Sequence, residues 1–134
     1  MGYEESLRSI TLNADSSLAM YTGVPGQPGP ANPNGGKQYH FVKVTGVHQD
    51  GLADADDVVV GVLQNKPQGP GHAATVGYHG VSKVGADGVI AAGAPVASSA
   101  DGQATATIGA PGRVGIALQS AAAAGELIAV LLER

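Results

Sequence analysis

The sequence predicts an all-β fold: a small antiparallel β-barrel or sandwich built from two similar strand-loop-strand units, with an extended N-terminal arm. Short runs in which apolar and polar residues alternate are separated by Gly, Asp and Pro, as is typical of antiparallel strands joined by turns. One strand-loop-strand pattern occurs twice at an offset of 54 residues, as from Gly61 to Gly115. Aromatic residues are scarce, with one Phe, four Tyr and no Trp, so the core must consist of small aliphatic side chains.

The repeated pattern begins with a short apolar strand, crosses a loop that ends in Gly, and resumes as a second strand. The first copy starts at Val60 and the second at Val114. Self-similarity at a fixed offset indicates a repeated structural unit. The matched pairs are Val60 and Val114, Gly61 and Gly115, Gly71 and Gly125, and Val76 and Val130.

Residues 1–38 differ in character from the rest of the chain. Thr22–Gly36 is dense in Pro, Gly and Asn, and its prolines remove backbone donors and favour extended backbone. We therefore interpret residues 1–38 as an N-terminal arm and Pro/Gly-rich tether, and residues 39–134 as the β domain. Within the arm, Ile10 and Leu12 alternate with polar residues, which predicts a short strand that pairs outside its own domain. A frayed terminus is the alternative.

The β domain is expected to be a succession of strands with tight turns at Asp87-Gly88 and Asp101-Gly102. Ser120–Ala124 is rich in Ala and favours a helix by propensity. The aligned part of the first copy holds Pro67 and Pro70, which argues against a helix in this unit. The predicted strands are Tyr39–Val47, Val58–Leu63, Ala73–Tyr78, Gly80–Val84, Pro95–Ser98, Ala104–Ile108, Val114–Leu118 and Leu127–Leu132.

Composition excludes several classes of partner. Charged residues make up 13% of the chain, the net charge is −4, and the seven Lys and Arg residues are dispersed. This distribution lacks the basic patch of a nucleic-acid-binding or membrane-surface protein, so neither partner is expected. The absence of Cys excludes disulfides and thiol chemistry. A small aliphatic core leaves a thin stability margin, for which subunit association is a common remedy.

The reactive residues form no recognisable catalytic or cofactor motif. The four His residues lack tight metal-ligand spacing, and no nucleophile has an identifiable base. The acidic run is the better candidate for a hard cation but does not follow the EF-hand pattern, so ion binding there stays open. We expect no catalytic residue, no cofactor and no resident metal, and hence no enzyme. The acidic run consists of Asp50, Asp54, Asp56 and Asp57.

The order of glycines and strands from Val58 to Leu132 is more specific than any single element. It runs from Gly61-Val62-Leu63 through Ile90–Val96 to Gly125–Leu132 at the end. This succession resembles the capsid cement, or head decoration, proteins of tailed bacteriophages. The resemblance implies a structural protein on the outer surface of the virion capsid, where homotrimers bind the major capsid protein and stabilise contacts between its subunits.

The capsid or subunit interface is expected among apolar residues outside the repeated units. The alternative function is a cell-surface or secreted β-module that binds carbohydrate or protein. Such a module usually shows clustered Trp or Tyr for sugar stacking, which this chain lacks. The predicted interface residues are Leu7, Ile10, Leu12, Leu18, Tyr21, Tyr39 and Phe41.

Overall fold

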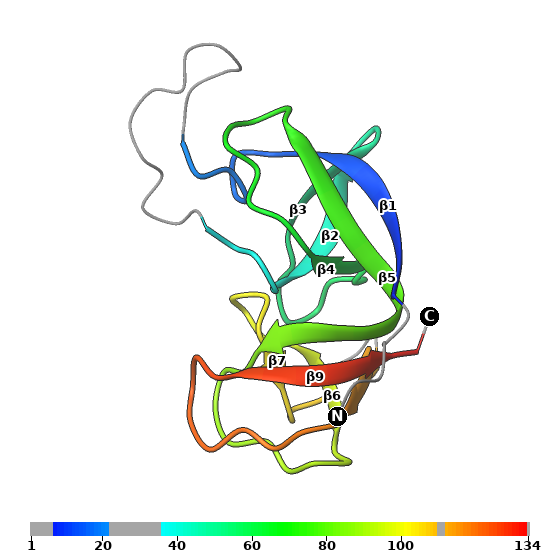
Figure 1. Ribbon diagram of the computed structural model, residues 1–134, viewed down its shortest axis with the longest axis vertical. Coiled ribbons are helices and arrows are strands. Elements are labelled where there is room, and N and C mark those ends of the chain that lie inside the picture. The colour runs from blue at the N-terminus through cyan, green and yellow to red at the C-terminus, as the bar shows by residue number, and fades with distance from the viewer. Residues whose placement is uncertain (1–6, 22–35, 110–111, 134) are drawn as a thin grey trace, which may run out of the picture.

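Nine strands and no helix make up the described part of the chain, which comprises residues 7–21, 36–109 and 112–133 of a computed structural model (Figure 1). The predicted all-β class is confirmed. The strands form one sheet in the order β1-β3-β2-β4-β5-β9-β8-β6-β7, and β1 also pairs with β5. The strands are β1 (Leu7–Ala14), β2 (Phe41–Gly46), β3 (Gln49–Leu52), β4 (Gly61–Leu63), β5 (Ala73–Gly85), β6 (Pro95–Ser98), β7 (Ala104–Thr105), β8 (Gly115–Ala117) and β9 (Leu127–Leu132).

The long strand β5 belongs to two rings of strands, one above the other in Figure 1. In the N-terminal half, β1 pairs with both β3 and the first part of β5, which closes the ring β1-β3-β2-β4-β5. In the C-terminal half, β9, β8, β6 and β7 follow the second part of β5, and a bridge between Ala86 and Ala104 closes the ring. The protein is therefore built as two small barrels that share one strand. The β1–β3 pair is parallel, so the sheet is mixed and not purely antiparallel.

The sequence repeat corresponds to a structural repeat, because equivalent strands in the two halves pair in the same register. Every pair that joins β2 to β4 or β4 to β5 recurs 54 positions later in the C-terminal half, and so do two of the four pairs that join β2 to β3. The repeat is thus larger than the strand-loop-strand unit that the sequence predicts. Equivalent pairs are Val44–Asp50 and Ser98–Ala104, Phe41–Val62 and Pro95–Ile116, and Leu63–Val76 and Ala117–Val130.

The second part of β5 is the equivalent of β1. Thr11 pairs with Thr75, and Lys83 pairs with Ala129 in the matching place. The offset for this strand is 72 residues, as from Ala14 to Ala86, whose parallel bridges to Asp50 and Ala104 are also equivalent. The halves differ in the length of the following loop, because 26 residues separate Ala14 from Phe41 and 8 separate Ala86 from Pro95. The longer loop contains Thr22–Gly36, of which residues 22–35 lie outside the described part of the chain.

The strand expected in the arm is present as β1, but the expectation that it pairs outside its own domain is wrong. It pairs along its length with β5 of the same chain, from Leu7 opposite Gly80 to Asn13 opposite Ala73. The physical reason is the repeat. In the C-terminal barrel β9 pairs with the second part of β5, and in the N-terminal barrel the first part of β5 pairs with β1 in the equivalent way. The described residues of the predicted arm, 1–38, therefore share one sheet with the predicted β domain, 39–134.

Most strands of the β domain lie where the sequence predicts them, and Pro95–Ser98 and Leu127–Leu132 match at both ends. Ala73–Tyr78 and Gly80–Val84 are one continuous strand, in which Gly80 has a φ of 112°. The strand Gln49–Leu52 was not predicted, because its Asp-Gly sequence is typical of a turn.

Each barrel has its own core of aliphatic residues, and equivalent positions fill both. The fully buried set includes the pairs Ala14 and Ala86, Leu18 and Ile90, Val42 and Val96, and Val76 and Val130. The single Phe, Phe41, belongs to the N-terminal strand β2 but packs in the C-terminal cluster, as do Val59 and Val62. The two barrels are thus joined by residues of the N-terminal half that pack in the C-terminal core, as well as by β5.

The repeated glycines Gly61 and Gly115 bring neighbouring strands into close contact. A Cβ at Gly61 would collide with the carbonyl oxygen of Gly77, and a Cβ at Gly115 would collide with that of Leu131. These obstacles are backbone atoms in the centre of the sheet, so they have little freedom to move aside. The repeat therefore retains glycine for a packing reason.

We predict that Gly61→Ala and Gly115→Ala each lower the free energy of unfolding by about 1–3 kcal/mol, since each forces two paired strands apart. Urea unfolding of the purified variants measures the change. Gly88→Ala is the control, because a Cβ at Gly88 meets no atom within 4 Å. Equal stability of all three variants would contradict the packing role of the repeated glycines.

Candidate interaction surfaces

The acidic residues of the run Asp50 to Asp57 do not converge on one point. Asp50 lies buried on β3, whereas the Asp57 carboxylate forms an ion pair of 2.7 Å with Lys43. Among the described residues, no group of three or more His, Cys, Asp or Glu side chains is placed to hold a metal ion. No helix of that part of the chain is long and apolar enough to cross a membrane. The features that stand out are two exposed apolar surfaces and one buried acid.

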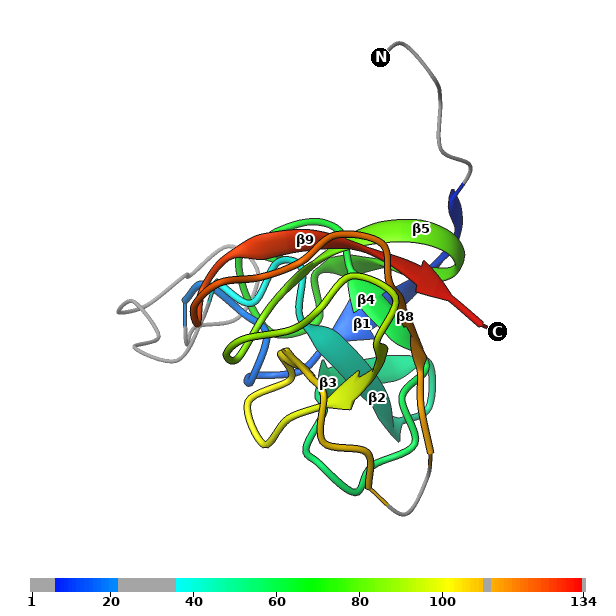
Figure 2. The ribbon, with the colours of Figure 1, turned by 90° about the horizontal axis from the view of Figure 1, so that it is seen from below.

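The first surface is the outer side of three neighbouring strands, and we call it the β5–β9–β8 face. Val81, Leu131 and Ile116 lie side by side across it, and Lys83 and Ala129 form the next row. Its three leucines are well exposed, with Leu127 at 51%, Leu118 at 45% and Leu131 at 39%. Figure 2 shows β9 and β5 side by side, with β2, β3 and β8 on one side of them. The face consists of Val81, Lys83, Ile116, Leu118, Leu127, Ala129 and Leu131.

The opposite side of the same strands forms the core of the C-terminal barrel. Val84, Ile128 and Val130 alternate with the residues of the face and are at most 2% exposed. The sheet is therefore apolar on both sides, although the described residues cover only one of them. Strands that are apolar on both sides are typical of sheets that are covered on both sides.

The equivalent face of the N-terminal barrel has different side chains, most of which are polar. Thr11 stands at the place of Lys83, Thr75 at that of Ala129, and Gln64 at that of Leu118. Apart from Ala73, the exposed and half-buried positions of this N-terminal face are polar, whereas Val62 and Gly77 are buried within the chain. The fold itself therefore does not require aliphatic residues on this side of the strands. Ser9, Thr11, Asn13 and Ala73 are exposed, and Gln64 and Thr75 are half-buried.

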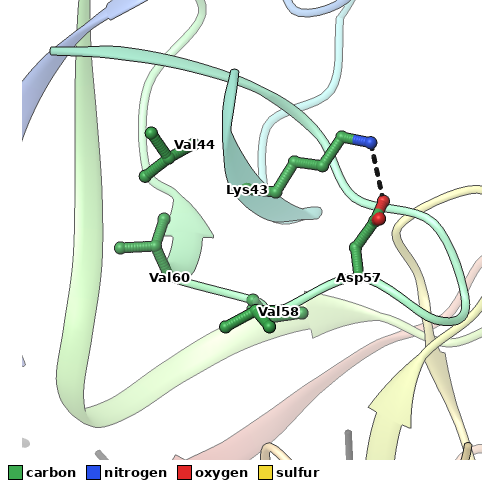
Figure 3. A pocket seen from close by; sticks show the side chains of 6 residues that line it. Lys43, Val44, Asp57, Val58 and Val60 are labelled. Atoms are coloured by element: carbon green, nitrogen blue, oxygen red, sulfur yellow. Dashed lines mark ion pairs between the residues drawn. The ribbon is translucent and has the colours of Figure 1, made fainter. Parts of the chain in front are cut away.

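A second apolar surface lies beside β2, and we call it the β2-edge pocket. The strand β2 pairs with β4 only at Phe41 and Val42 but pairs with β3 as far as Gly46, so its later residues have a strand on one side alone. Val44, Val58 and Val60 line a pocket of about 350 Å³ along this open edge (Figure 3). Val44 is 61% exposed and Val58 is 69% exposed.

An ion pair borders the β2-edge pocket. The hydrogen bond with Asp57 raises the pKa of Lys43 above its ordinary value, and the same bond lowers the pKa of Asp57. Both groups are thus held in their charged forms near neutral pH and neutralise each other. The pocket presents an apolar surface with a rim of no net charge (Figure 3).

The predicted interface residues do not form one surface. Leu18 and Phe41 are fully buried in the cores and expose nothing to a partner. Ile10 is 40% exposed, whereas the others are half-buried. The prediction missed the β5–β9–β8 face, although the apolar run Leu127–Leu132 was visible in the sequence. The half-buried set comprises Leu7 and Leu12, which pack against the core clusters, together with Tyr21 and Tyr39.

The buried acid is Asp50, whose two carboxylate oxygens have no hydrogen-bond partner in the described part of the chain. Its equivalent in the C-terminal barrel is Ala104, a fully buried core residue. Desolvation, with a further contribution from the charge of Asp15, raises the pKa of Asp50 to about 7. The carboxyl group of Asp50 is therefore largely neutral below about pH 7. At the equivalent position, the other barrel has the methyl group of Ala104.

No protein-family model matches the chain, and no curated protein matches its sequence. Among solved structures, the chain is similar to the crystal structure of the head fiber gp8.5 N base in bacteriophage phi29. The TM-score is 0.65 at 18% sequence identity, and the match covers 96% of this chain and 95% of that chain. At this identity the likeness establishes a shared fold.

We predict that Asp50→Ala stabilises the protein near neutral pH and removes a pH dependence. The pKa of Asp50 is raised from 3.8 to about 7 in the folded state, so the folded state binds the proton more tightly than the unfolded state. The stability that this proton contributes is fully present below pH 3.8 and is lost as the pH rises to about 7. The free energy of unfolding of the natural chain should fall by about 1.4 kcal/mol per pH unit across this window, other groups being equal.

Urea unfolding of the Asp50→Ala variant between about pH 4 and pH 8 measures the effect, and its stability curve should be the flatter one. Asp56→Ala, at an exposed position, is the control and should keep the slope of the natural chain. A slope that survives in Asp50→Ala would show that another group causes it.

Proposed function

We propose that this chain is a structural protein of a bacteriophage head. In this proposal it decorates the outer surface of the head and stabilises contacts between major capsid protein subunits, as a cement protein does. The observation that carries the proposal is the whole-length likeness of fold to the head fiber base of phage phi29. The order of glycines and strands from Val58 to Leu132, which resembles the capsid cement proteins, supports it independently.

The proposed mechanism is multivalent binding without catalysis, cofactor, nucleic acid or membrane. Each chain exposes two separate apolar surfaces on one all-β body, so it can contact a sister chain and a capsid subunit together. A homotrimer that contacts several capsid subunits gains from effective concentration even when each contact is weak. Such bridging would stabilise the shell against internal pressure without any chemical step.

We assign the capsid contact to the β2-edge pocket. An unpaired strand edge offers backbone hydrogen-bond groups to an extended segment, and the valines beside it offer a site for an apolar side chain. The equivalent edge in the C-terminal barrel carries Ser98 at the place of Val44. The apolar pocket is therefore a property of one barrel and not of the fold.

We predict that the natural chain sediments with purified phage heads that lack it and raises the temperature at which they release DNA. The double variant Val44→Ser/Val58→Ser should bind heads about tenfold more weakly, since it removes apolar contact from the pocket. Val89→Ser is the matched control, because Val89 is 76% exposed outside the pocket.

A natural chain that neither sediments with heads nor stabilises them would overturn the proposed function. Undiminished binding of the double variant, with the natural chain bound, would overturn only the assignment of the pocket.

A further inference from the structure

We propose that the β5–β9–β8 face is the surface through which copies of this chain associate with one another. The inference rests on the homo-oligomer in the proposed function, but not on binding to heads. It assigns the contact to C-terminal residues that differ from all seven predicted interface residues.

The two barrels provide an internal comparison. They share strand register, yet the counterparts of Leu118 and Ala129 are the half-buried polar residues Gln64 and Thr75. Even the backbone bonding around these positions is repeated: Leu118 donates its N–H to Ala129, as Gln64 does to Thr75. Because these strands form equally well with polar outer residues, strand formation does not explain the aliphatic residues of the C-terminal barrel.

The comparison also shows where this fold places aliphatic residues on the outer side of the strands. Val62, the counterpart of Ile116, is fully buried and belongs to the same core cluster as Val84 and Val130 of the C-terminal barrel. At the C-terminal barrel, Leu131 and Leu127 lie in the same outer rows but remain exposed. Contiguous exposed apolar residues are typical of interaction sites.

The composition of the face favours a second copy of the chain over a transient partner. Permanent homo-oligomer contacts are more apolar than transient contacts and are depleted of charge at their centre. Lys83 is the one charged residue among the seven that form the face. At its end beyond Leu131, the Arg113–Glu133 ion pair of 2.8 Å provides a polar border. An apolar centre with a polar border is the usual anatomy of such an interface.

The size of the face limits what it contributes. Three strands about 4.8 Å apart and three rows of side chains give an area of roughly 10 Å by 14 Å. A standard interface needs about 800 Å² from each partner. The face is therefore the apolar centre of the contact, and residues around it must complete the interface.

The first test transfers the N-terminal residues to the C-terminal face. The variant Leu118→Gln/Leu127→Ala/Ala129→Thr takes the residues found at positions 64, 73 and 75, whose strands have the same register. Light scattering after gel filtration should change from a multiple of 13.2 kDa for the natural chain to 13.2 kDa. Thr11→Lys is the control. It introduces at position 11 the residue type found at the equivalent position 83, and it should leave the assembled mass unchanged.

A second test does not depend on the folding of a triple variant. The chain has no Cys, so Lys83→Cys and Thr11→Cys each introduce a single thiol at equivalent places. Maleimide should label the thiol at position 83 about tenfold more slowly than that at position 11 in the assembled protein. The two rates should become equal when dilution separates the subunits.

A monomeric natural chain, an unchanged mass in the folded triple variant, or equal labelling of both thiols in the assembled protein would overturn the inference. The same experiments distinguish failure of this inference from failure of the proposed function. A natural chain that assembles through this face but does not bind heads would refute the head protein while supporting the interface.

Discussion

Pairing along β5 is the constraint on which the structure depends. The strand is 13 residues long and runs through both barrels, and it pairs with β1, β4 and β9. Its first part serves as the last strand of one barrel, and its second part serves as the first strand of the other. Small cores without Trp are thereby combined into one body, to which Phe41 adds a contact across the boundary. The close approach at Gly61 and Gly115 fixes the same register in each barrel.

The two barrels are near-copies, so the places where they differ carry information. A core that needs only a methyl group at Ala104 holds a carboxyl at Asp50, at a cost in stability near neutral pH. A face that is polar around Thr11 and Thr75 is aliphatic around Leu127 and Leu131. Since the backbone is shared, these differences reflect side-chain chemistry and not the demands of the fold.

The proposed function and the proposed subunit contact use different parts of the molecule. The β2-edge pocket belongs to the N-terminal barrel, and the β5–β9–β8 face belongs to the C-terminal barrel. In these proposals the chain binds a sister chain through the β5–β9–β8 face and a capsid subunit through the β2-edge pocket. Binding at two places on one body is what a protein needs if it stabilises a shell by contact alone.

The sequence by itself determined the all-β class, the 54-residue repeat and most strands after residue 39, because alternation and glycine placement are local properties. It did not determine the partner of β1, since the longer loop after Ala14 changes the offset from 54 to 72 and hides that strand from the repeat. It placed Leu18 and Phe41 at an interface, whereas the tertiary structure buries both. Alternation separates the two sides of a strand, but only strand pairing and barrel closure decide which side is covered.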